Sequence, residues 1–155
     1  MQNIEVPDLP AGQPQPRAAS MALREVAEAS KDFETRVRHQ LDVNATDLAA
    51  MEHLMVSGPL GPAELGRRLG LSRPAMTAVV DRLTALGHAT RSEHPNDRRG
   101  VIVTPVPASV DRAMRILRPM IAEVDAALDG FSEEQQAAIA EYLGRVVAAY
   151  RRHLD

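Results

Sequence analysis

The sequence predicts a mainly α-helical fold with one small two-stranded hairpin. After Met21, most of the chain repeats apolar residues every three or four positions, which is the pattern of amphipathic helices. Helix signals fade between His88 and Thr104, where the turn Pro95-Asn96-Asp97 precedes the β-branched run 101–103. With 155 residues, the chain fits one domain, or one domain with an extension.

The N-terminal part divides into an arm and a helix. Residues 1–20 hold four prolines, which lack a backbone donor and restrict the preceding residue, so this arm is predicted to be extended or disordered. From Met21 to about Leu41, apolar residues follow helical spacing with charged residues between them. Residues 21–44 are therefore predicted to form a first long helix and its end.

Capping residues mark three more helices within residues 45–104. Asn and Ser side chains cap helix N-termini, proline is tolerated in a first turn, and glycine commonly ends a helix. The predicted helices run from Asn44 to Gly58, from Pro62 to Gly70 and from Ser72 to Gly87. The hairpin follows them, with its tip near Pro95 to Arg98.

Two long helices are predicted in residues 105–155. Pro105 and Pro107 follow the hairpin, so the first of these helices is expected to start late. Ser132 and Gln135 have the spacing of a capping box for the last helix. The three helices outside residues 45–104 have no core of their own large enough to cover their apolar faces, which favours pairing with a second copy.

The composition excludes several classes of protein. The chain has no Cys, hence no disulfide framework, thiolate metal site or cysteine redox sensor. No apolar run approaches the ~18 residues that span a bilayer, and the N-terminus does not resemble a signal peptide, so we expect a cytoplasmic protein with no membrane partner. Sequence motifs for nucleophilic serine, phosphate-cradling glycine or zinc-hydrolase chemistry are absent. Neither an enzyme nor a cofactor is predicted.

The charge is unevenly distributed. The net charge is −3, yet residues 61–104 hold seven arginines against four acids. A basic segment in an acidic chain gives a one-sided electrostatic surface of the kind that attracts nucleic acid. Arg67 and Arg68 fit this surface equally well as phosphate contacts or as solvated charges.

The helix pair 62–86 suits readout of duplex DNA. In a helix-turn-helix, the N-terminal side chains of the second helix reach base edges in the major groove. Arg pairs bidentately with guanine, and the methyls of Thr and Ala contact thymine. Arg82, farther along the helix, is better placed for a phosphate. The predicted residues at the N-terminal end are Ser72, Arg73, Ala75 and Thr77.

The hairpin offers a second contact. Arg98 and Arg99 near its tip are predicted to enter an adjacent minor groove, where narrow A·T tracts concentrate negative potential. The carboxylate of Asp97 is expected to hold Arg99 in one orientation, which lowers the rotamer entropy lost on binding.

The order of these elements resembles the MarR family of winged-helix transcriptional regulators. The resemblance covers roughly residues 21–152 and is most specific in the wing, where Arg91 is followed by 97–99 and by 103–104, and then in the stretch 72–87. It implies a winged helix-turn-helix flanked by long dimerisation helices. It also implies a homodimeric regulator that binds double-stranded DNA and that a small aromatic or lipophilic effector often releases from its operator. It places Ser72, Arg73 and Thr77 at recognition positions, Arg99 as the wing arginine and Asp97 as its salt-bridge partner.

Three alternatives stay open. The candidate effector pocket is Phe33, His39, Met51 and Met55, although an ordinary core role fits these residues at least as well. His39 and His53, with Glu52, suggest a metal site, but no histidine pair has i, i+4 spacing and no thiolate is present, so no metal is predicted. A winged-helix protein-interaction module without DNA binding is the alternative function; intact Arg73, Thr77, Arg98 and Arg99 favour DNA.

Overall fold

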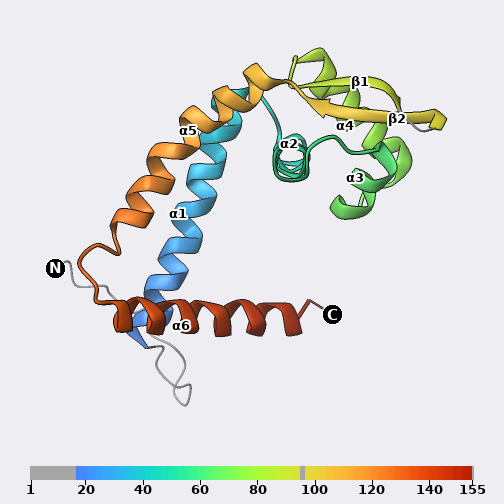
Figure 1. Cartoon of the computed structure of the whole chain (residues 1–155). Coiled ribbons are helices and arrows are strands. Elements are labelled where there is room, and N and C mark those ends of the chain that lie inside the picture. Colours follow the sequence, from blue (N-terminus) through green and yellow to red (C-terminus); the bar gives the residue numbers. More distant parts are fainter. Residues whose placement is uncertain (1–16, 95–96, 155) are drawn as a thin grey trace. The chain divides into compact units, whose positions relative to one another are not determined.

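The computed structural model describes residues 17–94 and 97–154, and the side chains of residues 94–99 lie outside the description. Over the described residues, the fold consists of six helices and one two-stranded antiparallel sheet (Figure 1), so the predicted fold class is confirmed. The chain divides into two compact units at Pro105/Val106. The first unit carries the helix-turn-helix and the hairpin, and the second carries the last two helices.

Helix α1 (Ala18–Leu41) begins at Ala18, before the predicted start at Met21. Alanine is the strongest helix former, and extended Arg17 is the N-cap residue, so helical backbone extends into the predicted arm. Residues 1–16, the rest of that arm, lie outside the described residues. At the other end, Asp42 adopts a left-handed conformation with φ of 58° and ends the helix.

Helix α2 (Ala45–Ser57) has the predicted bounds. The Asn44 side chain accepts a hydrogen bond of 2.8 Å from the backbone N–H of Asp47, and Gly58 is the C-cap. Asp47 lies three residues after Asn44, where a capping box has its second acceptor, but both oxygens of its carboxylate accept from Arg82 instead.

Helices α3 (Pro62–Leu69) and α4 (Arg73–Ala85) form the helix-turn-helix. Gly70, with φ of +65°, closes α3 in a left-handed conformation that glycine adopts at little cost. The Ser72 hydroxyl then caps α4 by accepting from the Ala75 N–H at 3.4 Å. The two helices approach closely at Gly66, where a Cβ would lie 3.5 Å from Met76 of α4 and 3.3 Å from the Leu71 carbonyl oxygen in the turn. The predicted boundaries of both helices are confirmed.

Strands β1 (Ala89–His94) and β2 (Asp97–Pro105) form the antiparallel hairpin. A contact that the sequence did not indicate joins this hairpin to the helices. Leu60, just before α3, forms an isolated antiparallel bridge with Val103, with backbone hydrogen bonds of 3.0 and 2.8 Å in the two directions. The base of the hairpin is therefore held to the segment that leads into α3.

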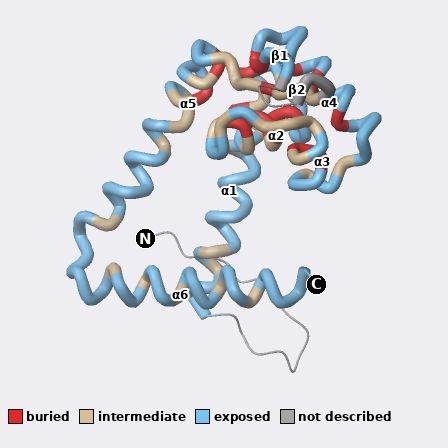
Figure 2. Tube along the Cα trace, turned by 45° about the vertical axis from the view of Figure 1, so that its right-hand side comes forward, coloured by how far each residue is buried: buried red, intermediate tan, exposed pale blue. Residues whose placement is uncertain are grey.

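The core of the first unit gathers around α2 and α4, where Figure 2 shows most of the buried residues. Leu65, Val80 and Leu83 are fully buried, and the His88 ring is buried with its Nε2 2.9 Å from the Leu41 carbonyl oxygen. The first unit buries the apolar residues Val37, Leu41, Leu48, Ala50, Met51, Leu54, Leu65, Met76, Val79, Val80, Leu83, Ala89 and Val103.

The second unit consists of α5 (Pro107–Ala126) and α6 (Glu133–Arg152). The expected late start of α5 is wrong: Pro107 occupies the first helical turn, where its missing N–H would have no helical partner. The capping box of α6 is confirmed, with Ser132 and Gln135 each accepting the other's backbone N–H. In α6, which is described throughout, no residue is buried.

Candidate nucleic-acid interface

The predicted base-reading residues lie together on the exposed surface of α4. Ser72, Arg73, Ala75 and Thr77 are all exposed, whereas Met76 in the same turns is buried. The Thr77 hydroxyl donates to the Arg73 carbonyl oxygen at 3.0 Å, so its proton is already used within the helix. The Thr77 methyl and a hydroxyl lone pair remain as the groups that this side chain offers to a ligand.

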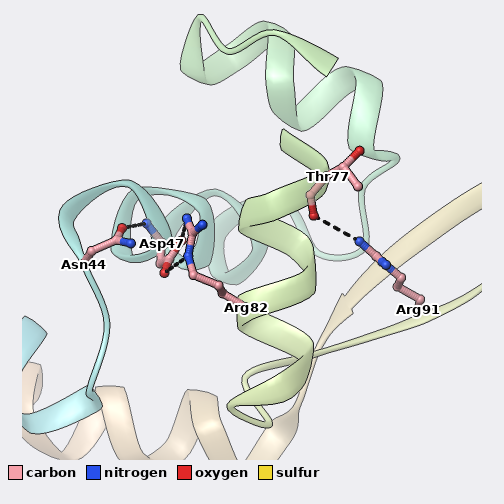
Figure 3. A network of polar contacts seen from close by, with 5 residues as sticks. All are labelled: Asn44, Asp47, Thr77, Arg82 and Arg91. Atoms are coloured by element: carbon pink, nitrogen blue, oxygen red, sulfur yellow. Dashed lines mark hydrogen bonds and ion pairs between the residues drawn. The ribbon is translucent and has the colours of Figure 1, made fainter. Parts of the chain in front are cut away.

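Arg82 has an intramolecular partner that its place in the sequence does not indicate. Its Nε donates to Asp47 Oδ2 at 3.0 Å and its Nη2 donates to Asp47 Oδ1 at 2.7 Å (Figure 3). The hydrogen bond to Asp47 raises the pKa of Arg82 above its ordinary value. A contact between Arg82 and phosphate remains a prediction, and the bidentate pair adds a role in joining α4 to the start of α2.

A second ion pair joins α4 to the hairpin. Arg91 of β1 places Nη1 2.5 Å from Asp81 Oδ1. Its Nη2 donates to the Thr77 carbonyl oxygen at 3.3 Å (Figure 3). In the sequence, Arg91 carries part of the family resemblance of the wing, and nothing in the spacing of Asp81 indicates a partner. Asp81 and Arg82 are consecutive, so α4 is held by a carboxylate on the hairpin side and by a guanidinium on the α2 side.

The tip of the wing is described only in its backbone. Asp97 pairs with His94 where the strands meet, and residues 97–99 belong to β2. The side chains of Arg98 and Arg99, and the predicted Asp97–Arg99 salt bridge, lie outside the described residues. These assignments stay predictions.

Helix α3 carries its own charge network. Glu64 forms ion pairs with both Arg67 and Arg68, and Arg68 also donates to the Ser57 hydroxyl at 2.6 Å. The Arg68 side chain is therefore tied to the surface of the first unit, whereas Arg67 is 78% exposed. Of the two arginines, Arg67 is the better candidate for a phosphate contact.

The Glu64 network predicts an acid-side effect on stability. The hydrogen bond from Arg68, with the charges of both arginines, lowers the pKa of Glu64 below its ordinary value of 4.5. A lowered folded-state pKa contributes stability that is present above the unfolded pKa and is lost as pH falls through the folded pKa. Glu64→Gln should therefore show less loss of stability than the parent chain on acidification below about pH 4.5, measured by thermal melts at stepped pH. A parallel loss in the two proteins would contradict this coupling.

The four residues of the candidate effector pocket have different environments. Met51 is buried in the core, Phe33 and Met55 are half-buried, and His39 is exposed. A hollow of about 420 Å³ lies elsewhere, against the N-terminal half of α4, and none of the four lines it. Apolar residues of α3, the turn, α4 and β2 line that hollow together with Arg73 and Thr77. Among the described residues, no group of three or more acidic or histidine side chains is arranged to hold a metal ion.

A helix-turn-helix followed at once by an antiparallel hairpin defines a winged helix-turn-helix, a class of DNA-binding fold. The family model described as the MarR family matches residues 41–100. The chain is 29% identical over 139 residues, 90% of each chain, to an HTH-type transcriptional regulator of Bacillus subtilis, YcgE.

Solved structures share the same fold. A MarR-like transcriptional regulator from Thermotoga maritima superposes with a TM-score of 0.67 at 24% identity, over 88% of this chain and 99% of that chain. A mutant of Staphylococcus aureus MepR, bound to an oligodeoxyribonucleotide, gives a TM-score of 0.62 at 14% identity, over 87% and 99% of the two chains. The match over residues 41–100 and the shared fold make the chain similar to the MarR family of transcriptional regulators. No helix in the described residues is both long and apolar enough to cross a membrane.

Proposed function

We propose that this chain is a homodimeric, ligand-responsive transcriptional repressor of the cytoplasm that reads a pseudo-palindromic operator. Helix α4 enters the major groove and the wing enters the adjacent minor groove. The observation that carries the proposal is the exposure of Ser72, Arg73 and Thr77 along one end of α4, next to a hairpin whose sequence is basic.

Direct base readout by α4 is sparse. Arg73 supplies the long donor side chain suited to guanine, and Thr77 supplies a methyl for thymine. Ala75 and Ala78 are exposed but have no polar side-chain group. Much of the specificity is therefore assigned to the position of the backbone on the duplex and to the shape of the duplex.

The wing acts together with α4. The Arg91–Asp81 ion pair and the bond from Arg91 to the Thr77 carbonyl join β1 to the recognition helix. Arg98 and Arg99, predicted from the sequence, would then meet the minor groove at a fixed distance from the major-groove residues. This arrangement favours duplexes in which the widths of the major and minor grooves match the fixed spacing between α4 and the wing.

Homodimerisation is supported by an apolar stripe on α6. Leu143, Val147 and Tyr150 share one face, at spacings of four and three, and are 44% to 66% exposed in the single chain. Exposed apolar residues in such a row mark a surface that associates with a partner. A two-fold dimer presents two recognition helices to half-sites about 10 base pairs apart.

The effector is assigned to the class that the family resemblance implies, a small aromatic or lipophilic molecule. The hollow beside α4 supports a direct mode of release, because Arg73 and Thr77 line it and an occupant there would cover the base-reading residues. Binding of DNA and of the effector would then be mutually exclusive, which is the strongest negative coupling that two ligands can have.

Salt dependence tests DNA binding. We expect the chain to shift a duplex selected from a randomised pool, and its affinity to fall by about 10³-fold or more between 50 and 200 mM salt, because a dimer with six or more phosphate contacts releases that many counterions. Electrophoretic mobility shift at several salt concentrations measures the slope, with a random duplex as control. The proposal fails if neither duplex binds at low salt.

A further inference from the structure

Arg82 and Asp47 form a pair that is buried on one side and accessible on the other. The Asp47 side chain is only 2% exposed, whereas that of Arg82 is 45% exposed. Two parallel hydrogen bonds, of 3.0 and 2.7 Å, hold the guanidinium in the plane of the carboxylate. The acid therefore belongs to the interior of the first unit, and the base reaches its surface.

Asp47 is itself held in place. It lies in the first turn of α2, its backbone N–H is bound by the Asn44 side chain, and the positive end of the helix dipole favours a carboxylate there. Because Asp47 is held at the start of α2, its two hydrogen bonds to Arg82 fix the guanidinium against that helix. They also tie the C-terminal half of α4 to the same point.

We propose that Asp47 is a positioning residue for DNA binding, which holds the Arg82 guanidinium ready for one phosphate of the duplex. This role rests on the proposed function. A guanidinium has five N–H donors, and the pair uses two of them, at Nε and Nη2. No contact within the described part of the chain engages Nη1, and the half-exposed side chain leaves this edge within reach of a phosphate oxygen. A fixed guanidinium loses less rotamer entropy on binding than a free one.

The pair also changes what Arg82 contributes. Beside a carboxylate its charge is partly compensated at long range, so its attraction for a duplex acts mainly at the one phosphate that it contacts. Its contribution is a donor at a fixed position relative to Arg73 and Thr77, which lie earlier on the same helix. Loss of Asp47 should therefore reduce discrimination between duplexes rather than general affinity.

Asp47→Asn tests this role, because it keeps the size and polarity of the side chain and removes its charge. We expect affinity for a duplex selected by the parent chain to fall about tenfold, and affinity for a random duplex to stay within about twofold. Glu141→Gln is the matched control. It also removes one negative charge, from an exposed pair with Arg145 on α6, and it should leave the ratio of the two affinities unchanged.

Two Arg82 variants separate positioning from folding. Arg82→Lys keeps the charge but cannot form the bidentate pair, and it should reduce the affinity ratio as Asp47→Asn does. Arg82→Ala should lower the slope of log affinity against log salt by about 0.9, the loss of one phosphate contact. The double variant Asp47→Asn with Arg82→Lys should lose no more than either single change, because both remove one interaction.

The outcomes are distinct. The inference is overturned if Asp47→Asn, folded by circular dichroism, keeps the affinity ratio, or if it tightens binding to both duplexes, which would mean that Asp47 only sequesters Arg82. An unchanged salt slope in Arg82→Ala also overturns it. If Asp47→Asn does not fold, the inference is tested by the affinity ratio of Arg82→Lys and by the salt slope of Arg82→Ala. A parent chain that binds neither duplex overturns the proposed function itself.

Discussion

Replacing Leu83 by alanine is expected to lower the free energy of unfolding of the first unit by about 2–5 kcal/mol. Leu83 is on the inner face of α4, is fully buried, and shares the core with Leu65 and Val80. Removal of its side chain loses the transfer free energy of the buried atoms and leaves a cavity that the backbone of the helix-turn-helix cannot easily fill. Urea denaturation of both proteins at one protein concentration measures the difference, since association would otherwise shift the midpoint.

Leu86→Ala is the matched control for this prediction. It removes the same atoms three residues later on the chain, at the C-cap of α4, where the side chain is 42% exposed. The expected loss is about 1 kcal/mol or less, because a half-exposed leucine transfers less area from water. Equal losses in the two variants would show that α4 does not pack on the rest of the first unit through the Leu83 face.

The local features of this fold could be predicted from the sequence. Asn44, Ser72 and Ser132 each cap the helix that was assigned to them, because a cap depends on a side chain and a backbone N–H only three residues apart. Two helix starts were missed for equally local reasons. The prolines after the hairpin predict a late start for α5, although Pro107 suits a first helical turn. The proline-rich composition of residues 1–20 places Ala18 in the arm, although alanine favours a helix.

The contacts that orient the candidate interface could not be predicted in this way. Asp47 and Arg82 are 35 residues apart, and nothing in the spacing of either residue indicates the other. Asp47 lies three residues after Asn44, the spacing of a local helix cap, and that spacing gives no sign of a long-range partner. The Leu60–Val103 bridge is another such contact, because a single paired residue leaves no alternating pattern.

The candidate effector residues illustrate a different limit. The apolar spacing that predicts a helix does not separate a core position from a pocket position. Met51 fitted both readings and is a core residue. The hollow beside α4 is lined from α3, α4 and β2 together, so it depends on tertiary packing that the sequence does not show directly.

Breaking the α6 stripe is expected to have the largest effect on DNA binding. The double variant Leu143→Asp, Val147→Asp places two carboxylates in an apolar face that we assign to the dimer interface, where each would be buried without a partner. We expect a monomer in sedimentation and a loss of at least about 100-fold in affinity for a duplex with two half-sites, because the second half-site is no longer bound intramolecularly. Affinity for a duplex with one half-site should change little, since the variant leaves α4 untouched.

Ala148→Asp is the control for this loss. Ala148 is exposed on the same helix but lies beside the face that carries the Glu141–Arg145 pair, about 100° around the helix from Val147. A carboxylate there should leave both the dimer and its affinity for the two-half-site duplex intact. If the double variant stays dimeric, or if the control also dissociates, the stripe is not the interface. A monomeric double variant that keeps full affinity for two half-sites would separate dimerisation from operator binding, and the pseudo-palindromic reading would then be wrong.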